Sequence, residues 1–254
     1  MAEERSLAAG EARIKFSCTR VGSFWELVNG DQKEKEKLEQ ATKGLAELLL
    51  YEEEHGYAPM APDGRIGGNG ASKIVIKDKE YVLLSKSGKL PGKMDYKSDF
   101  CLVSRFDTEK WSCEYFSEQP ETKPTSDTPM HYQLLKNVQG AFSALHGHAI
   151  EKEEVAKALN VPCSVEETLF STPADTKAMF TLLEEYPYPK WKIFVRKNHG
   201  FYILGRDLNE CKTVLNEKLI SQENKISIPK MKKTHKRKVN NAARKKPYNL
   251  RKRK

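Results

Sequence analysis

Leu145-His146-Gly147-His148-Ala149 is the segment that decides how this chain is interpreted. Two histidines separated by one residue of an extended strand point to the same face, so both imidazoles can reach one ion while Gly147 faces away. Lys197-Asn198-His199-Gly200 offers a third imidazole. Three neutral imidazoles on a divalent ion leave positions open for water or substrate oxygens, as in catalytic rather than structural sites. The pattern therefore predicts a metal site made by His146, His148 and His199.

The length and composition predict an intracellular globular protein. A chain of 254 residues is long enough to bury a substantial core as one domain. No apolar run approaches the roughly 18 residues of a membrane span. The first five residues also lack the basic start of a secretory signal. The five cysteines form no Cys-x-x-Cys pair, so we expect reduced, mostly buried thiols.

Positive charge is concentrated near the carboxyl end. The formal net charge is +9, but residues 229–254 hold 13 Lys or Arg and no acid. The preceding residues are therefore mildly acidic, with 31 (44 − 13) basic against 35 acidic side chains. Such dense basic clusters are typical of a nuclear targeting signal that binds an import receptor, or of nonspecific nucleic-acid binding. A solvated tail without a partner is the alternative.

Helical spacing of apolar residues is clearest from Gln32 to about His55, and Gly56 stands where that helix would end. A later helix has Thr128 as its expected cap and Pro129 at its first helical position. This helix is expected near residues 128–139. The remaining helices are expected near residues 151–160, 174–186 and 207–219.

Strands are expected where β-branched and aromatic residues cluster between turn residues. Residues 63–70 are rich in glycine and are predicted to be a loop. Residues 13–21 are too short and mixed for an assignment. Beside the strand that carries the first two histidines, strands are expected at residues 73–76, 81–84, 100–106, 111–116, 191–196 and 201–204.

Several turn and loop motifs surround the histidines in the sequence. In order they are Gly67–Ser72, Ser85–Gly88, Pro124–His131, His146–His148 and Asn198–Gly200. This series resembles the class II aldolase and adducin head family. The resemblance implies a three-layer α/β/α domain with a mainly antiparallel central sheet over residues 13–220. A flexible N-terminus (1–12) and a disordered basic tail (221–254) would flank it, and the subunits would form a homo-oligomer.

The resemblance also implies roles for particular residues. A zinc ion, or another divalent transition metal, would bind His146, His148 and His199. Phosphate would bind at Ser87 and Gly88 and at Thr125 and Ser126. The second pair has independent support, because hydroxyls and free N–H groups at a helix N-terminus attract anions. Ordinary turn chemistry is the alternative for both pairs.

Asp127 is the candidate catalytic acid or base. It stands where related aldolases carry a glutamate, and a carboxylate beside the ion can exchange a proton with carbon or with bound water. The alternative is that Asp127 only caps the helix that follows. Both roles can coexist.

The implied function is that of a zinc-dependent lyase of aldolase or dehydratase type, or an epimerase. It would act on a phosphorylated sugar through a metal-stabilised enediolate. Two alternatives remain open: a catalytically inactive, adducin-like interaction module, and a nuclear or nucleic-acid-associated protein that works through residues 229–254. The expected location is cytoplasmic, nuclear or both, without a membrane partner.

Overall fold

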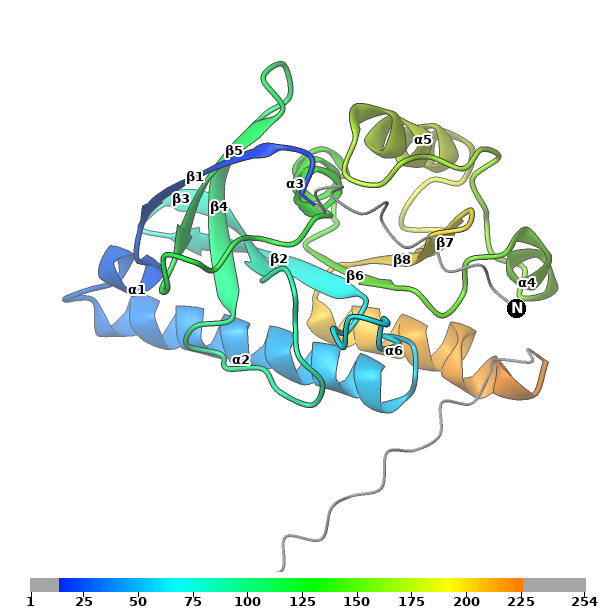
Figure 1. Ribbon diagram of the computed structural model, residues 1–254, viewed down its shortest axis with the longest axis horizontal. Coiled ribbons are helices and arrows are strands. Elements are labelled where there is room, and N and C mark those ends of the chain that lie inside the picture. The colour runs from blue at the N-terminus through cyan, green and yellow to red at the C-terminus, as the bar shows by residue number, and fades with distance from the viewer. Residues whose placement is uncertain (1–13, 226–254) are drawn as a thin grey trace, which may run out of the picture.

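The computed structural model describes residues 14–225. The expected flexible N-terminus and the basic clusters of the tail therefore lie outside the described residues. Within the described range, one sheet is covered by α2 and α6 on one face and by α3 and α5 on the other (Figure 1). The predicted three-layer α/β/α architecture is confirmed. No helix in this range is long and apolar enough to cross a bilayer.

Eight strands in the described part of the chain form the sheet, in the order β1-β5-β4-β3-β2-β6-β8-β7. Neighbouring strands are antiparallel except β1 and β5, so the prediction of a mainly antiparallel sheet is confirmed. The strands are β1 (Ser17–Gly22), β2 (Asn69–Ile76), β3 (Lys79–Ser85), β4 (Phe100–Asp107), β5 (Ser112–Ser117), β6 (Ser143–Gly147), β7 (Ile193–Arg196) and β8 (Gly200–Gly205).

The helices follow the predicted positions closely. The longest, α2, begins after Asp31, whose carboxylate accepts a hydrogen bond from the Glu34 N–H, and it ends just before Gly56, whose φ is +81°. The helices are α1 (Phe24–Leu27), α2 (Gln32–Glu54), α3 (Thr128–Asn137), α4 (Glu153–Ala158), α5 (Pro173–Glu185) and α6 (Leu208–Lys218). A 3₁₀ helix (Ile220–Lys225) follows, and it includes the first residues of the expected tail.

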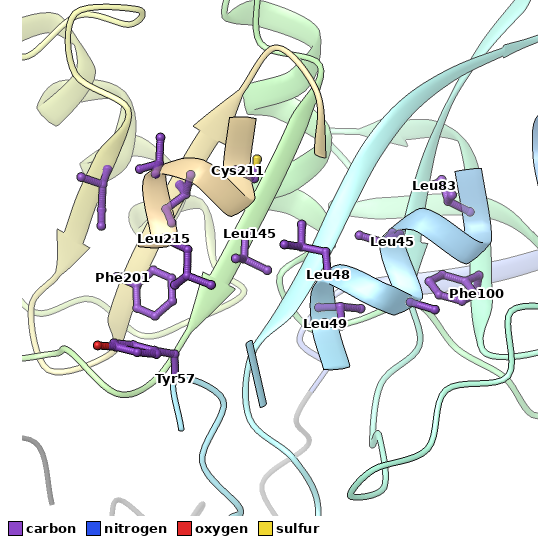
Figure 2. Close-up of a cluster of buried hydrophobic side chains, with 14 of the residues drawn as sticks. Leu45, Leu48, Leu49, Tyr57, Leu83, Phe100, Leu145, Phe201, Cys211 and Leu215 are labelled. Atoms are coloured by element: carbon purple, nitrogen blue, oxygen red, sulfur yellow. The ribbon is translucent and has the colours of Figure 1, made fainter. Parts of the chain in front are cut away.

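The core lies on both faces of the sheet because period-two alternation sends successive side chains to opposite sides. In β8, Phe201 and Ile203 join the cluster under α2 and α6, while Tyr202 and Leu204 join the cluster under α3 and α5. Figure 2 shows the first cluster, to which α2 contributes Leu45, Leu48 and Leu49, β6 contributes Leu145 and β8 contributes Phe201. Each fully buried leucine contributes about 1.5–3 kcal/mol. The packing fixes β6 and β8 side by side.

Three details differ from the sequence prediction. Strand β2 begins at Asn69, inside the predicted loop, because Asn69 and Gly70 pair with β6. Strand β1 received no assignment from the sequence, and among the described residues it is an edge strand that pairs only with β5. Helix α3 begins at Thr128 with Asp127, not Thr128, at the N-cap position. Pro129 is thus the second helical residue.

Candidate metal centre

The three histidines lie where β6 ends and the neighbouring strand β8 begins. His146 is on β6, His148 follows that strand, and His199 occupies the turn between β7 and β8. The pairing of His146 with Tyr202 brings this turn beside the histidine pair. Gly200 has a φ of +147°, and a Cβ there would collide with the Gly147 carbonyl oxygen. Glycine is therefore required for the close approach of the two segments.

The three imidazoles converge on one point. One ring nitrogen from each residue lies within 4.8 Å of the others. The ring centroids are 4.7 Å apart for His146 and His148, 5.0 Å for His146 and His199, and 5.1 Å for His148 and His199. The residues that the sequence predicted as ligands are thus brought together by the fold, although His148 lies just beyond the strand.

The chemistry of His146 fits a metal ion. Its Nδ1 lies 2.7 Å from the Phe201 carbonyl oxygen, which can only accept, so Nδ1 carries the hydrogen and Nε2 carries a lone pair. Among residues 14–225 this buried Nε2 has no hydrogen-bond partner. Burial lowers the pKa of His146 and of His199 well below the usual value. Neutral imidazole with its second nitrogen anchored to a carbonyl is the form that binds metals.

Asp127 lies beside this triad. Its carboxylate is 2% exposed, and Oδ2 is 3.8 Å from His146 Nε2. Oδ2 accepts a hydrogen bond of 2.7 Å from Asn69 Nδ2, and Oδ1 accepts one of 2.9 Å from Arg196 Nη1. Asp127 stands at the N-cap position of α3, but in the described residues its side chain makes no capping hydrogen bond.

Arg196 is the residue of this site that sequence reasoning missed. Its guanidinium is buried and forms a forked pair with Asp175 of α5, through Nε at 3.2 Å and through Nη2, while Nη1 binds Asp127. Burial alone would raise the pKa of Asp127, but nearby cationic groups, Arg196 among them, lower it well below the usual value. Since burial also keeps His146 neutral, Arg196 is the partner that holds Asp127 ionised.

The charges of this cluster also suit a cation. Asp127 and Asp175 carry two negative charges and Arg196 one positive, which leaves a net charge of −1 in a buried region. Buried charge is costly unless it is compensated. A divalent ion on three neutral imidazoles would compensate it. The residues present therefore fit a divalent metal.

A hydrogen-bonded chain continues from Asp127 along the face of the sheet that α3 covers. Asn69 donates to Asp127, so its Oδ1 accepts from His131 Nε2 at 2.5 Å. His131 Nδ1 then accepts from the Tyr202 hydroxyl. Burial lowers the pKa of His131 to about 4, which agrees with a neutral ring. His131 is thus a structural histidine that orients Asn69.

The two predicted phosphate-binding turns lie side by side. Lys86 and Pro124 form an isolated antiparallel bridge, and the Ser87 N–H donates to the Lys123 carbonyl at 2.9 Å. This bridge places Ser87 and Gly88 next to Thr125 and Ser126. The second turn leads directly into Asp127, and so connects to the metal centre.

A cation stands beside these turns. The aliphatic stem and guanidinium of Arg65 lie 3.6–3.7 Å from the position of a Cβ on Gly88, and the side chain is 48% exposed. Arg65 lies in the predicted loop 63–70, and its charge was the only feature of the sequence that could have indicated a binding role. A half-exposed guanidinium can attract a phosphate that the turn residues bind.

The fold and the three-histidine site can now be compared with known protein families. The family described as "Class II Aldolase and Adducin N-terminal domain" matches residues 63–217, more than half of the chain. The chain belongs to this family. A comparison with curated proteins found no match.

Solved structures with similar folds include the following three. The N-terminal class II aldolase domain of a conserved protein from Thermoplasma acidophilum has a TM-score of 0.49 and 16% identity, over 77% of this chain and 93% of that one. A sugar-phosphate aldolase from Thermotoga maritima gives 0.47 and 14%, over 70% and 88%. An L-fuculose-1-phosphate aldolase from Thermus thermophilus gives 0.46 and 16%, over 70% and 90%.

Proposed function

We propose that this chain is a zinc-dependent lyase of aldolase or dehydratase type, or the related epimerase, acting on a phosphorylated sugar. One observation carries the proposal: three imidazoles converge beside a buried, ionised carboxylate. Membership of the class II aldolase family supports the same class of reaction. Another divalent transition metal that favours imidazole ligands could replace zinc.

When bound, the ion would supply Lewis-acid polarisation of the sugar's carbonyl and hydroxyl oxygens. His146, His148 and His199 would hold it as neutral donors and so leave its positive charge undiminished. Ser87, Gly88, Thr125 and Ser126 would anchor the phosphate, with Arg65 adding positive charge. Two anchors at fixed positions would orient the sugar, which is the main requirement for stereospecific bond cleavage or inversion.

Asp127 would act as the acid or base through a remaining lone pair. Oδ1 already accepts a hydrogen bond from Arg196 and Oδ2 one from Asn69, but each carboxylate oxygen has two lone pairs and can accept again. The two hydrogen bonds stabilise the ionised carboxylate and so make Asp127 a weaker base.

The hydrogen bonds from Arg196 and Asn69 weaken Asp127 as a base, and this favours a second candidate, a catalytically inactive, adducin-like module that keeps the metal. A general base needs a lone pair that faces the substrate. This candidate predicts a bound metal without turnover of any sugar phosphate.

The predicted partners and location form part of the same proposal. We propose a homo-oligomer of this domain (residues 13–220). Residues 229–254 would direct the protein to the nucleus, or bind nucleic acid, in addition to a cytoplasmic pool. Deleting residues 229–254 should remove any strongly salt-dependent affinity for RNA or DNA, and an unchanged affinity would exclude that role.

The test of the enzymatic proposal is turnover of a panel of ketose phosphates by the zinc-loaded protein, assayed for cleavage, dehydration and epimerisation. His146→Ala should abolish turnover. His55→Ala is the matched control, since His55 bonds to the Tyr51 carbonyl at the end of α2 and should leave turnover unchanged. Turnover that survives His146→Ala would contradict the proposal, and a metal-loaded protein inactive on every member would favour the adducin-like candidate.

A further inference from the structure

Asp127 is close enough to the histidines to be a fourth metal ligand. Two donor atoms on one tetrahedral zinc lie about 3.4 Å apart when both bonds are about 2.0–2.1 Å long. The separation of Asp127 Oδ2 from His146 Nε2 is 3.8 Å. A small rotation of the carboxylate would therefore bring it into the coordination sphere of an ion held by His146.

Two buried donors hold the carboxylate away from that position. Arg196 Nη1 donates to Oδ1 at 2.9 Å and Asn69 Nδ2 donates to Oδ2 at 2.7 Å. A hydrogen bond from a guanidinium to a carboxylate is charge-assisted and among the strongest in proteins. The pair is 4% and 2% exposed, so water does not compete for it.

Arg196 is itself held in place. Its Nε and Nη2 bind both oxygens of Asp175, which also accepts from Thr168 Oγ1 at 2.9 Å. Asp175 lies in the first turn of α5, where Thr172 caps the helix. The guanidinium is thereby fixed on one side by α5, and only one of its N–H groups points toward Asp127.

We propose that Arg196 is a positioning residue that keeps Asp127 off the metal, so that the protein supplies three ligands and coordination positions stay open for substrate oxygens. The inference rests on the proposed metal site. Freed from the guanidinium, Asp127 would bind the ion as a fourth ligand, tighten its binding and close one open position. Arg196 thus lowers the affinity for the metal and keeps a coordination position accessible to the substrate.

The experiment uses Co²⁺ as the probe, because its visible absorption reports coordination number and ligand type without any need for turnover. The informative variant is the double substitution Arg196→Met with Asp175→Asn, which removes one charge of each sign and leaves the net buried charge at −1. Co²⁺ should bind it about tenfold more tightly than the wild-type chain, the size of effect known for residues that surround metal ligands. Its spectrum should show an added oxygen ligand.

Adding Asp127→Asn to the double variant should return the spectrum to that of three nitrogen ligands, since the amide is a poorer ligand than the carboxylate. A double variant with the wild-type spectrum and affinity would overturn the role of Arg196. A wild-type chain that leaves Co²⁺ with the spectrum of the free ion would instead overturn the metal site.

A crystal structure of the cobalt-loaded wild-type chain provides a test that does not depend on the folding of the variants. The Asp127 oxygens should remain on Arg196 and Asn69. A direct bond between Asp127 and the ion would overturn the inference.

Discussion

Gly147→Ala places one methyl group between the first two histidines, and its cost follows from the surroundings of Gly147. A Cβ at this position would lie 2.5 Å from Phe201 Cε1 and 2.5 Å from the Tyr57 carbonyl oxygen, and closer still to Glu52 Oε1. Real Cβ atoms do not approach other atoms so closely. The carbonyl belongs to the backbone, Phe201 is fully buried and Glu52 is fully buried, so none of the three can move freely.

Overpacking by one methylene costs about 1–3 kcal/mol in a close-packed core. Three simultaneous collisions place Gly147→Ala at the upper end, about 3 kcal/mol. For a domain of this size the melting temperature should fall by about 6–12 °C. Displacement of the backbone between His146 and His148 should also weaken zinc binding.

The assay is thermal unfolding monitored by circular dichroism, with and without zinc. Gly22→Ala is the matched control, because a Cβ on Gly22 meets only ordinary contacts at 3.5 Å and beyond. The control should melt within about 2 °C of the wild type, as surface substitutions usually do. A Gly147→Ala chain that melts with the control would refute the steric reasoning.

Three further predictions concern stability and the surroundings of the site. Arg196→Met alone leaves Asp127 and Asp175 buried without their partner. It should lower the free energy of unfolding of the zinc-free chain, measured in urea, by about 3–5 kcal/mol. A loss below about 1 kcal/mol would contradict the buried pairing. Burial lowers the pKa of His131 to about 4 from near 6.5 in the unfolded chain, so this residue alone should remove about 2 kcal/mol of stability by pH 5, in addition to losses from His146 and His199. The His131→Gln chain should therefore lose about 2 kcal/mol less than the wild type between neutral pH and pH 5, and an equal loss would argue against this source. Leu45→Ala empties a fully buried position under β2 and should cost about 2–5 kcal/mol in the same assay, and a cost near zero would show that the described core is wrong.

Much of the fold could be predicted because local patterns agreed with the tertiary structure. The leucines of α2 recur at helical spacing, and Asp31 and Gly56 mark its ends. Edge strand β1 escaped prediction because its residues alternate between exposed and half-buried without a fully buried side chain. The first residues of β2 read as a loop since Asn69 and Gly70 lack β propensity, and only pairing with distant β6 makes them a strand.

The metal ligands could be predicted because histidine spacing carries its own signal, but the surrounding network could not. Arg196 ends a short apolar strand, and only its unusual charge there marks it. Its partners Asp127 and Asp175 lie 69 and 21 residues away in sequence. Asn69 and Asp127 are 58 residues apart. Contacts of this kind depend on the assembled sheet, which no local pattern describes.

The most direct test of the central claim is the zinc content of the purified chain after removal of metal, reconstitution with Zn²⁺ and exhaustive dialysis. We predict one tightly held zinc per chain in the wild type and loss of that zinc in His199→Gln. Failure of the wild-type chain to retain zinc, or equal retention by the His199→Gln chain, would contradict the claim that the three imidazoles bind one ion.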